Sequence, residues 1–551
     1  MKITLNGNFK EYEYKTTVEQ IISDLAPDML DKTMGVRIGG RVKELSDFIK
    51  DDAELHLLTY SDEEGRRIYE RSLRFVMLIA AKRAFPHAKV RIEHSVGEGI
   101  YTVFEDMRIY PADIMLLEGA MHDVVKEDLS FNKRRISKEE AVKYFVENGD
   151  PEKARLLAYR PYKHFNLYEC GGVSEYFYGA MLPSTGKVPI FALRHHSPGF
   201  VLLLPSSKDF TVPSKFVNLP KQMATFAQSN YWCRVLDCSD VADLNDLIKQ
   251  NKLNDFIRVN EALHDKSISD IASDILNRDA RAVFISGPSS SGKTTFANRL
   301  CIHLRVNGLR PVLISLDDFY RNRWELPLEN DGEPDLEAID ALDVPLIKKC
   351  ITSLLEGKET YMPRFDFTTQ TQNTNAYKLK IDYNQPLIIE GIHALNPRLH
   401  GAFDKKLIFK IYISELTCIN LDSHNRIRTT DARLLRRIVR DNLFRNTPPA
   451  KTLSMWDKVR RGEEKWVFPY QEQADVMFNS ALHYELPVLK RFSYDMLRQI
   501  PKDNPDYLKV NRIIKILHYM LPAPEEALSD IPPLSILREF IGGNTLYMKN
   551  N

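Results

Sequence analysis

The segment Gly287-Pro-Ser-Ser-Ser-Gly292-Lys293-Thr294 decides the fold of the second half of this chain. It matches the G-x-x-x-x-G-K-[ST] pattern of a phosphate-binding loop. The apolar run 282–285 before it is typical of a buried parallel strand, and residues 295–304 after it are typical of a helix. A strand that enters a helix through such a loop directs backbone N–H groups at phosphate oxygens. We therefore expect a nucleoside triphosphate to bind to Gly287, Pro288, Ser289, Ser290, Ser291, Gly292, Lys293, Thr294 and Thr295.

Two further apolar runs, 311–315 and 385–389, end in carboxylates. Ligands of a doubly wound sheet bind at the carboxyl ends of its strands, so both acids are expected beside the phosphates. Asp317, with Asp318 next to it, can accept a proton from an attacking hydroxyl, although an acidic helix N-cap is the alternative. Glu390 takes the place of a Walker-B-type acid. The predicted Mg²⁺ ligands are Thr294, Asp317 and Glu390.

A substrate site is expected between these two strands. Residues 361–367 predict a loop whose rings, Phe365 and Phe367, could enclose a planar base or cover a sugar. Asp335 could accept hydrogen bonds from ribose hydroxyls. An acid that stabilises a helix N-terminus is the alternative reading of Asp335.

Arginines recur at helical spacing in the most basic stretch, residues 421–465. Arg433, Arg437 and Arg440 share one face of a predicted helix, and Arg445 follows in a turn. A mobile helical lid that carries arginines would neutralise the charge that develops during phosphoryl transfer and exclude water. A solvated basic face or an RNA-binding stripe is the alternative.

Composition excludes several classes of protein. The chain has 551 residues, with 76 Lys+Arg against 75 Asp+Glu, so no global charge attracts nucleic acid or a membrane. Its six cysteines form no C-x-x-C pair, which argues against a zinc ribbon or a disulfide framework. The N-terminus lacks an apolar signal core, and no run of about 18 apolar residues occurs. We expect a soluble cytoplasmic protein.

The pattern of elements predicts an α/β protein with several domains. Alternating strands and helices after residue 276 are typical of a parallel sheet covered on both faces. Alternating apolar residues, a turn at Asn6-Gly7-Asn8 and one amphipathic helix predict a small β-grasp unit at the start. The expected division is 1–61 β-grasp domain, 62–225 α+β domain, 226–275 helical connector, 276–500 P-loop domain with a helical lid, and 501–551 C-terminal helical segment.

The first half resembles threonyl-tRNA synthetases. The β-grasp order resembles their TGS module, and the helix that begins at Arg71, with the strands after it, resembles their editing domain. That family has an H-x-x-x-H pair on this helix and a later Cys-x-x-x-His. Here the first pair reads Arg71 and Phe75, and the second is taken as Cys170 and Ser174. The resemblance therefore implies an editing-like scaffold without its hydrolytic site.

The second half resembles the uridine kinase branch of the uridine kinase, phosphoribulokinase and pantothenate kinase superfamily. The P-loop, Asp317-Asp-Phe-Tyr320, Pro363-Arg-Phe-Asp-Phe367, Glu390-Gly391 and the arginine helix occur in that order. The resemblance implies magnesium ligands at Thr294 and Glu390, a general base at Asp317, and phosphate contacts from Lys293. It further implies nucleoside contacts at Tyr320, Asp335, Phe365 and Phe367 and lid arginines at Arg437, Arg440 and Arg445. Gln370 stands where that branch has a base-reading histidine.

The leading hypothesis is therefore an ATP- or GTP-dependent, Mg²⁺-requiring kinase of the 5′-hydroxyl of a ribonucleoside such as uridine. Two alternatives remain: a kinase of another small alcohol, such as a sugar, a sugar phosphate or a pantothenate-like compound, and an RNA-associated, nucleotide-dependent regulator. A membrane partner is not expected. A tRNA-like ligand for the first half and self-association both stay open. Removal of residues 1–225 is expected to leave kinase chemistry in the remainder.

Overall fold

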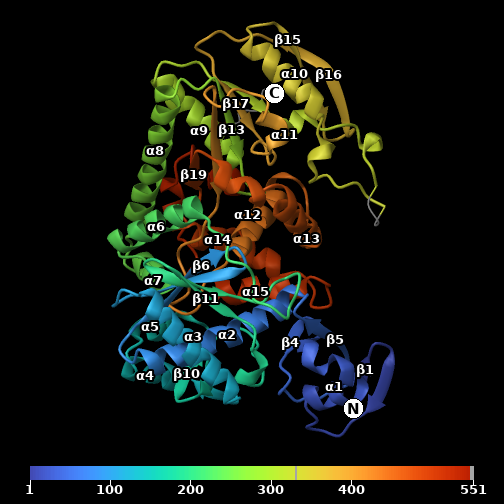
Figure 1. The fold of residues 1–551 in the computed structure, drawn as a ribbon, viewed down its shortest axis with the longest axis vertical. Coiled ribbons are helices and arrows are strands. Elements are labelled where there is room, and N and C mark those ends of the chain that lie inside the picture. The colour runs from blue at the N-terminus through green and yellow to red at the C-terminus, as the bar shows by residue number, and fades with distance from the viewer. Residues whose placement is uncertain (329–331, 547–551) are drawn as a thin grey trace.

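The computed structural model describes residues 1–328 and 332–546. The P-loop half lies at one end of the elongated molecule and the N-terminal half at the other (Figure 1). The last residues of the predicted C-terminal segment, 547–551, lie outside the described residues, as do 329–331 in the P-loop domain. No helix in the described ranges combines the length and the apolar character needed to cross a bilayer.

A five-stranded parallel sheet organises the P-loop half, which confirms the predicted α/β class. Its order is β14-β17-β13-β18-β19, and each neighbouring pair is parallel. The central strand β13 is buried along its whole length, as its continuous apolar sequence predicts. The strands are β13 (Ala282–Ser286), β14 (Val312–Ser315), β17 (Leu387–Glu390), β18 (Ile408–Ser414) and β19 (Val476–Asn479).

Helices cover both faces of this sheet. Side chains alternate along β13, so Val283 and Ile285 belong to one core and Ala282 and Phe284 to the other. Within the predicted C-terminal helical segment, Tyr507–Leu517 and Arg538–Ile541 are α-helices. The helices of this half and its connector are α6 (Pro220–Val235), α7 (Val241–Lys249), α8 (Leu253–Asn277), α9 (Lys293–Val306), α10 (Val344–Leu355), α11 (Pro397–His400), α12 (Thr429–Phe444), α13 (Pro449–Trp466), α14 (Glu485–Arg498), α15 (Tyr507–Leu517) and α16 (Arg538–Ile541).

The predicted loop at 361–367 is wrong in one respect, because these residues form most of a strand. β15 (Thr360–Asp366) pairs in antiparallel register with β16 (Thr371–Leu379), with an irregularity between Met362 and Arg364. The hairpin projects from the top of the P-loop half (Figure 1). Backbone pairing across the two strands satisfies polar groups that a free loop would leave to water, so the rings near its tip sit on an ordered support.

The first sixty residues, the predicted β-grasp unit, form a five-stranded sheet around one amphipathic helix. The mixed sheet has the order β2-β1-β5-β3-β4. Asn6 and Gly7 both have positive φ angles, 52° and 82°, as a two-residue hairpin turn requires. Thr17 caps the helix through a hydrogen bond from the backbone of Gln20. The elements are β1 (Lys2–Leu5), β2 (Asn8–Glu11), α1 (Val18–Leu25), β3 (Thr33–Ile38), β4 (Arg41–Lys43) and β5 (Ala53–Thr59).

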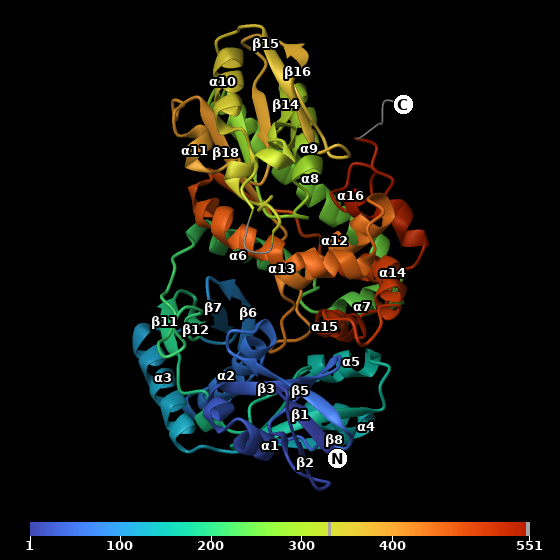
Figure 2. The same ribbon diagram turned by 90° about the vertical axis from the view of Figure 1, so that its right-hand side faces the viewer.

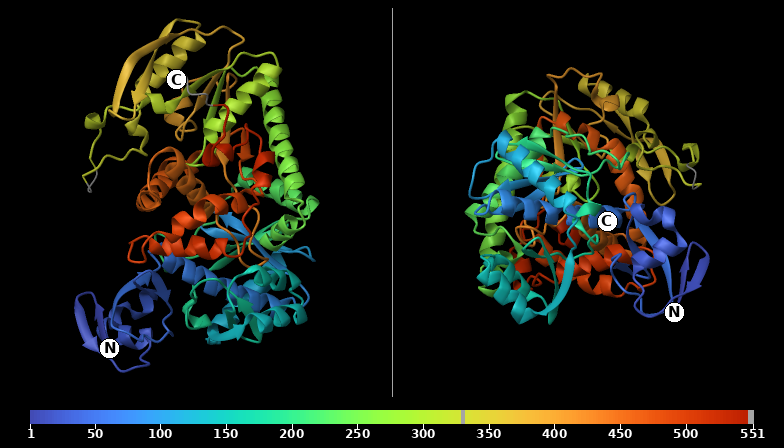
Figure 3. Two further views of the ribbon diagram at one scale, coloured as in Figure 1. Left: turned by 180° about the vertical axis from the view of Figure 1, so that it is seen from behind. Right: turned by 60° about the horizontal axis from the view of Figure 1, so that its bottom comes forward.

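A long buried helix and two antiparallel sheets make the next unit. The sheets have the orders β11-β12-β7-β6 and β10-β9-β8. Seen from behind, this unit lies beside the β-grasp unit at the lower end of the molecule (Figure 3). The elements are α2 (Glu63–Ala84), β6 (Val90–Val96), β7 (Gly99–Phe104), α3 (Pro111–Lys126), β8 (Asn132–Ser137), α4 (Lys138–Glu147), α5 (Pro151–Tyr159), β9 (His164–Cys170), β10 (Val173–Tyr176), β11 (Ala192–His196) and β12 (Gly199–Leu203).

Buried ion pairs join the two halves. Asp431, at the start of α12, accepts hydrogen bonds from Arg512 on α15 at 3.0 and 3.1 Å and from Arg67 on α2 at 3.4 Å. All three side chains are at most 8% exposed. Burial alone would raise the pKa of Asp431, but Arg512 and Arg67 outweigh it and lower that pKa. Figure 2 shows α12 and α15 in the middle of the molecule, between the parallel sheet and the N-terminal units.

This network changes the expectation for a truncated chain. Glu70 on α2 pairs with Arg426 and Arg428, and Glu175 on β10 pairs with Lys153 and His424. Deletion of residues 1–225 would take Glu70 from Arg426 and Arg428, and Arg67 from Asp431, which keeps Arg512. Loss of these buried partners should destabilise the truncated chain.

Asp431→Ala should lower the free energy of unfolding by about 3–5 kcal/mol, because it leaves Arg67 and Arg512 buried without their shared carboxylate. The measurement is chemical denaturation of the full chain. Asp270→Ala is the matched control, since Asp270 pairs with Lys266 on the surface of α8, where both side chains are more than 60% exposed. Equal effects of the two variants would contradict a structural role for the buried network.

Candidate functional site

The P-loop has the geometry that its sequence predicts. Gly292 adopts a left-handed conformation, with φ at 82°, and a Cβ there would lie 2.4 Å from Ile536. Lys293 begins α9, and its Nζ donates to the carbonyl oxygen of Pro288 at 3.1 Å. Burial lowers the pKa of Lys293, although the nearby Glu390 and Asp317 oppose this shift. The ammonium thus lies at the carboxyl end of the sheet, as expected for a phosphate contact.

Arginines of α12 donate hydrogen bonds to Ser289 and Ser290 of the loop. Arg433 donates to the carbonyl oxygen of Ser289 at 3.0 and 2.8 Å. Arg436 donates to the carbonyl oxygen of Ser290 at 3.3 Å, and Arg437 donates to the Ser289 hydroxyl at 2.8 Å. Each contact restrains one side of the loop, so its remaining N–H groups keep a fixed direction.

The helix predicted to be a lid is buried in this structure. Residues 431–441 of α12 are all buried, and Arg433 is 1% exposed, which is against the alternative of a solvated basic face. The leucine and isoleucine face of the helix packs into the main core. Arg433 supports the loop backbone through Ser289.

Three arginines do gather at the open side of the loop. Asp441 accepts from Arg440 at 2.8 Å and pairs with Arg437 at 3.3 Å and with Arg445 at 3.8 Å. The Arg445 side chain is 59% exposed, whereas Arg437 and Arg440 are buried. Burial and the neighbouring Arg440 lower the pKa of both Arg437 and Arg445. One carboxylate for three guanidinium groups leaves an excess positive charge that suits phosphate.

The two predicted acids meet at adjacent strand ends. Ser315 donates to Glu390 at 2.9 Å, and its oxygen also accepts the backbone N–H of Asp317 at 3.3 Å. Burial and the neighbouring Asp317 raise the pKa of Glu390 to about 7. The Asp317 side chain is partly open to solvent, but desolvation by the surrounding protein raises its pKa as well.

These oxygens suit Mg²⁺. Two crowded carboxylates that resist ionisation together, beside the hydroxyl-bearing Thr294 at the start of α9, form a hard oxygen donor set. Within the described residues no group of three His, Cys, Asp or Glu side chains could hold a metal. An ion here would therefore need water and phosphate oxygens as further ligands, which is usual for Mg²⁺.

The predicted aromatic residues come together above Asp317. Ring centroids of Tyr320 and Phe365 lie 5.7 Å apart, those of Phe365 and Phe367 5.0 Å, and those of Tyr320 and Phe367 6.3 Å. Phe367 is 63% exposed, and the Tyr320 hydroxyl donates to the carbonyl oxygen of Leu336 at 3.2 Å. Burial, together with Asp317, raises the pKa of Tyr320 well above its usual value. The three rings therefore form an ordered apolar surface next to the candidate base.

Two other predicted substrate residues have local structural partners. Asp335 accepts the backbone N–H of Glu337 at 3.0 Å in a turn, and it is not at a helix N-terminus as the alternative had it. The side chain of Gln370 accepts from Arg323 at 3.2 Å. Gln370 has a φ of 56° in the turn between β15 and β16. Neither residue belongs to the ring cluster described above.

Sequence reasoning missed two acids at the loop. Glu463 on α13 accepts the backbone N–H of Ser289 at 2.8 Å and pairs with Arg433. Glu539 on α16 accepts the Thr295 hydroxyl at 2.6 Å. Both lie far from the motif along the chain. No local sequence pattern marks either acid, because their contacts depend on where α13 and α16 pack.

The N-terminal half contains no editing site of the family's type at the expected positions. Phe75 is fully buried against Phe177, with ring centroids 5.6 Å apart, and Arg71 donates to the carbonyl oxygen of Ala180 at 2.9 Å. The segment in contact with Arg71 and Phe75 is thus 177–180, whereas Cys170 lies near Arg83 toward the end of α2. Cys170 is a buried thiol whose pKa is raised by burial to about 11.

Arg433→Lys should weaken binding of ADP at least about tenfold, because an ammonium cannot hold both the Ser289 carbonyl oxygen and Glu463 as the guanidinium fork does. Isothermal titration of the full chain measures this. Arg461→Lys on the exposed side of the same α13 helix that carries Glu463 is the control and should leave affinity unchanged. Unchanged affinity in Arg433→Lys would contradict the support of the loop by α12.

Comparisons with known proteins give different relatives for the two halves of the chain. Residues 283–486 match the Phosphoribulokinase / Uridine kinase family. A solved structure described as a possible uridine kinase of Bacillus stearothermophilus is 22% identical, with a TM-score of 0.27, and covers 38% of this chain and 97% of its own. Threonine–tRNA ligases match the N-terminal half. That of Desulforamulus reducens is 31% identical over 191 residues, and that of Caldanaerobacter subterraneus is 32% identical over 196 residues.

The two matches cover different parts of the chain. Each ligase match covers about a third of this chain, and the chain spans about 30% of the length of either ligase. The P-loop half thus matches the phosphoribulokinase and uridine kinase family over residues 283–486, and the N-terminal half is similar to part of threonine–tRNA ligases.

Proposed function

We propose that the protein transfers the γ-phosphoryl group of ATP or GTP to the 5′-hydroxyl of a ribonucleoside of the uridine or cytidine kind. The observation that carries this proposal is the cluster of Tyr320, Phe365 and Phe367 beside Asp317. A flat base can lie against such rings while its ribose extends toward the acid. Simple sugars and other small polar alcohols have no flat aromatic group to stack on three clustered rings.

The residues of the site divide the work between binding and proton transfer. Lys293 and the loop N–H groups would bind the β- and γ-phosphates, and Arg437, Arg440 and Arg445 would neutralise the charge on the transferred group. Asp317 would accept the proton of the attacking hydroxyl as its oxygen bonds to phosphorus and the diphosphate leaves. Mg²⁺, held by Thr294, Asp317 and Glu390, would supply charge neutralisation on the phosphates.

Two roles proposed from the family resemblance need a change of local structure. Asp335 would have to exchange its bond from the Glu337 backbone for a ribose hydroxyl. Gln370 would have to turn away from Arg323 to reach a base. We keep both as substrate residues of the proposal, with the ring cluster as its main support.

A kinase of another small alcohol is the second candidate, and the domain match supports it equally at the level of reaction class. One observation favours this second candidate. Gln370, at the position where the uridine kinase branch has a base-reading histidine, is already hydrogen-bonded to Arg323 and so does not face a base. Incubation with ATP, Mg²⁺ and uridine, cytidine, pentoses or pantothenate, with detection of ADP and of the phosphorylated product, separates the two. Turnover of an alcohol without turnover of any nucleoside would refute the leading proposal.

Asp317→Asn should reduce kcat by about 10²–10⁴-fold and leave ATP affinity within a few fold, because the amide keeps the shape of the side chain and cannot accept the proton. Steady-state kinetics and titration of ADP measure the two effects. Asp318→Asn is the control on the neighbouring residue, whose pKa burial raises in the same way. A larger loss of kcat in Asp318→Asn than in Asp317→Asn would show that Asp318 is the base.

Phe365→Ala should raise the KM for the nucleoside about tenfold and leave the KM for ATP unchanged, since the ring is one third of the proposed base surface. Tyr383→Ala removes an exposed ring from outside this cluster and serves as the control. If the KM for ATP rose while that for the nucleoside stayed constant, the cluster would belong to the nucleotide donor instead.

A further inference from the structure

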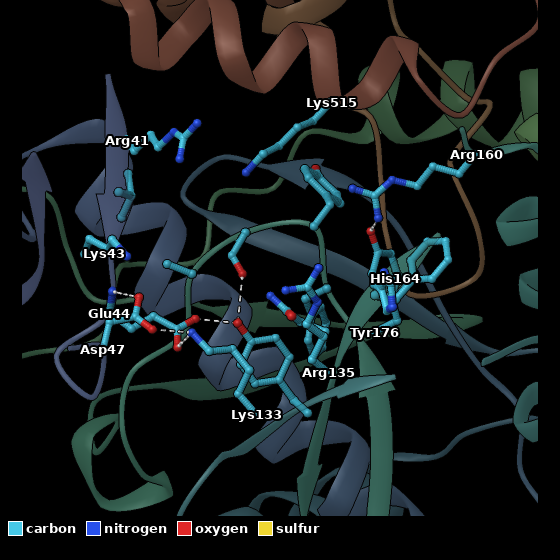
Figure 4. A pocket seen from close by; sticks show the side chains of 18 residues that line it. Arg41, Lys43, Glu44, Asp47, Lys133, Arg135, Arg160, His164, Tyr176 and Lys515 are labelled. Atoms are coloured by element: carbon cyan, nitrogen blue, oxygen red, sulfur yellow. Dashed lines mark hydrogen bonds and ion pairs between the residues drawn. The ribbon is translucent and has the colours of Figure 1, made fainter. Parts of the chain in front are cut away.

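A cavity separate from the P-loop site lies between segments of the chain that are distant in sequence. It measures about 600 Å³ and is lined by β4 of the β-grasp unit, by β8 and β9 of the following unit and by α15. No residue of the P-loop, the acids or the ring cluster lines it. Figure 4 shows Arg41, Lys515 and Arg160 along its upper rim and Lys133 and Arg135 below.

Positive charge dominates the lining. Its cations are Arg41, Lys43, Lys133, Arg135, Arg160 and Lys515, whereas its carboxylates are Glu44 and Asp47. Lys133 takes both carboxylates, at 2.7 and 2.6 Å. Glu44 also accepts from the Tyr168 hydroxyl and from the backbone of Met181 at 3.1 Å, so its oxygens are committed. The six cations therefore exceed the two carboxylates by four charges, and both carboxylates are bound to Lys133.

The remaining cations have no acidic partner within the part of the chain that the structure describes. No ion pair or side-chain hydrogen bond there involves Arg41, Lys43, Arg135 or Lys515. Burial lowers the pKa of Lys515, and the nearby Arg71, Arg160 and Arg41 lower it further, against the opposing Glu64. Like charges held this close to one another cost free energy until an anion joins them.

Arg160 is held rigidly in this group. Its guanidinium lies 4.7 Å from the ring centre of Tyr162 and 5.0 Å from those of Phe165 and Tyr519, and it donates to the Tyr176 hydroxyl. Its Nε is buried without a partner among the described residues. An arginine fixed by rings has lost its conformational freedom in advance, so little more is lost when it binds a phosphate.

We propose that this cavity binds a small ligand with more than one phosphate group, of the size of a nucleoside di- or triphosphate. Cations on opposite walls are too many for one phosphate, and the volume is within the range of small-ligand sites. A duplex or tRNA backbone would instead require a long basic stripe, whereas these cations surround a single hollow. The inference is independent of the proposed kinase activity, because it concerns a different site.

The test must separate this cavity from the P-loop. Lys293→Ala in the full chain weakens the P-loop site, and equilibrium dialysis on that background, at about 0.1 M salt, then measures binding of ATP, GTP and inorganic tripolyphosphate. Arg135→Gln and Lys515→Gln, singly and together, remove cations of the cavity. Arg134→Gln is the matched control, since Arg134 is the neighbour of Arg135 on β8 and pairs with Glu169 at the surface.

We expect the Lys293→Ala protein to bind at least one of the three probes. The double cavity variant should bind that probe at least about tenfold more weakly, and Arg134→Gln should bind as the parent does. Each single variant should show part of the loss, which separates a binding effect from misfolding, and the thermal midpoint checks the fold. Absence of binding in the Lys293→Ala protein would overturn the inference. Retention of total tRNA without binding of any small probe would overturn it too.

Discussion

The burial of α12 is the constraint on which the rest of this structure depends. Its apolar face belongs to the core below the parallel sheet, its arginines hold the carbonyl oxygens of Ser289 and Ser290, and Asp431 at its start ties it to α2 and α15. A helix fixed in this way gives the P-loop a defined shape before any nucleotide arrives. Such preorganisation lowers the cost of binding and of charge development during transfer.

The same helix makes the N-terminal half a structural part of the P-loop domain. Ion pairs between α2, α12 and α15 are buried, and their geometry compensates for the loss of water around the charges. A region similar to part of threonine–tRNA ligases thus contacts the P-loop half through buried ion pairs of α2. The basic cavity arises from the same arrangement, because its cations meet only when β4, β8, β9 and α15 are assembled.

Local sequence patterns predicted the strands of the parallel sheet and the position of the loop between β13 and α9. The P-loop, the strand ends at Asp317 and Glu390 and the turn at Asn6-Gly7 all depend on neighbouring residues, so a local pattern contains their cause. The aromatic cluster was also predicted, but as part of a loop and not as the tip of a paired hairpin.

Long-range packing could not be predicted in this way. Periodicity shows that α12 has a basic and an apolar face, yet the pairing of Arg433 with Glu463 depends on where α13 returns. The contact of Glu539 with Thr295, and the contacts of Phe75 and Arg71 with residues 177–180, also depend on distant chain positions. The most direct test of the account is a crystal structure of the full chain with ADP, Mg²⁺ and uridine. We expect the ADP phosphates in the P-loop, the pyrimidine ring of uridine against Phe365 and the ribose 5′-hydroxyl facing Asp317. A nucleoside bound elsewhere, with the ring cluster empty, would contradict it.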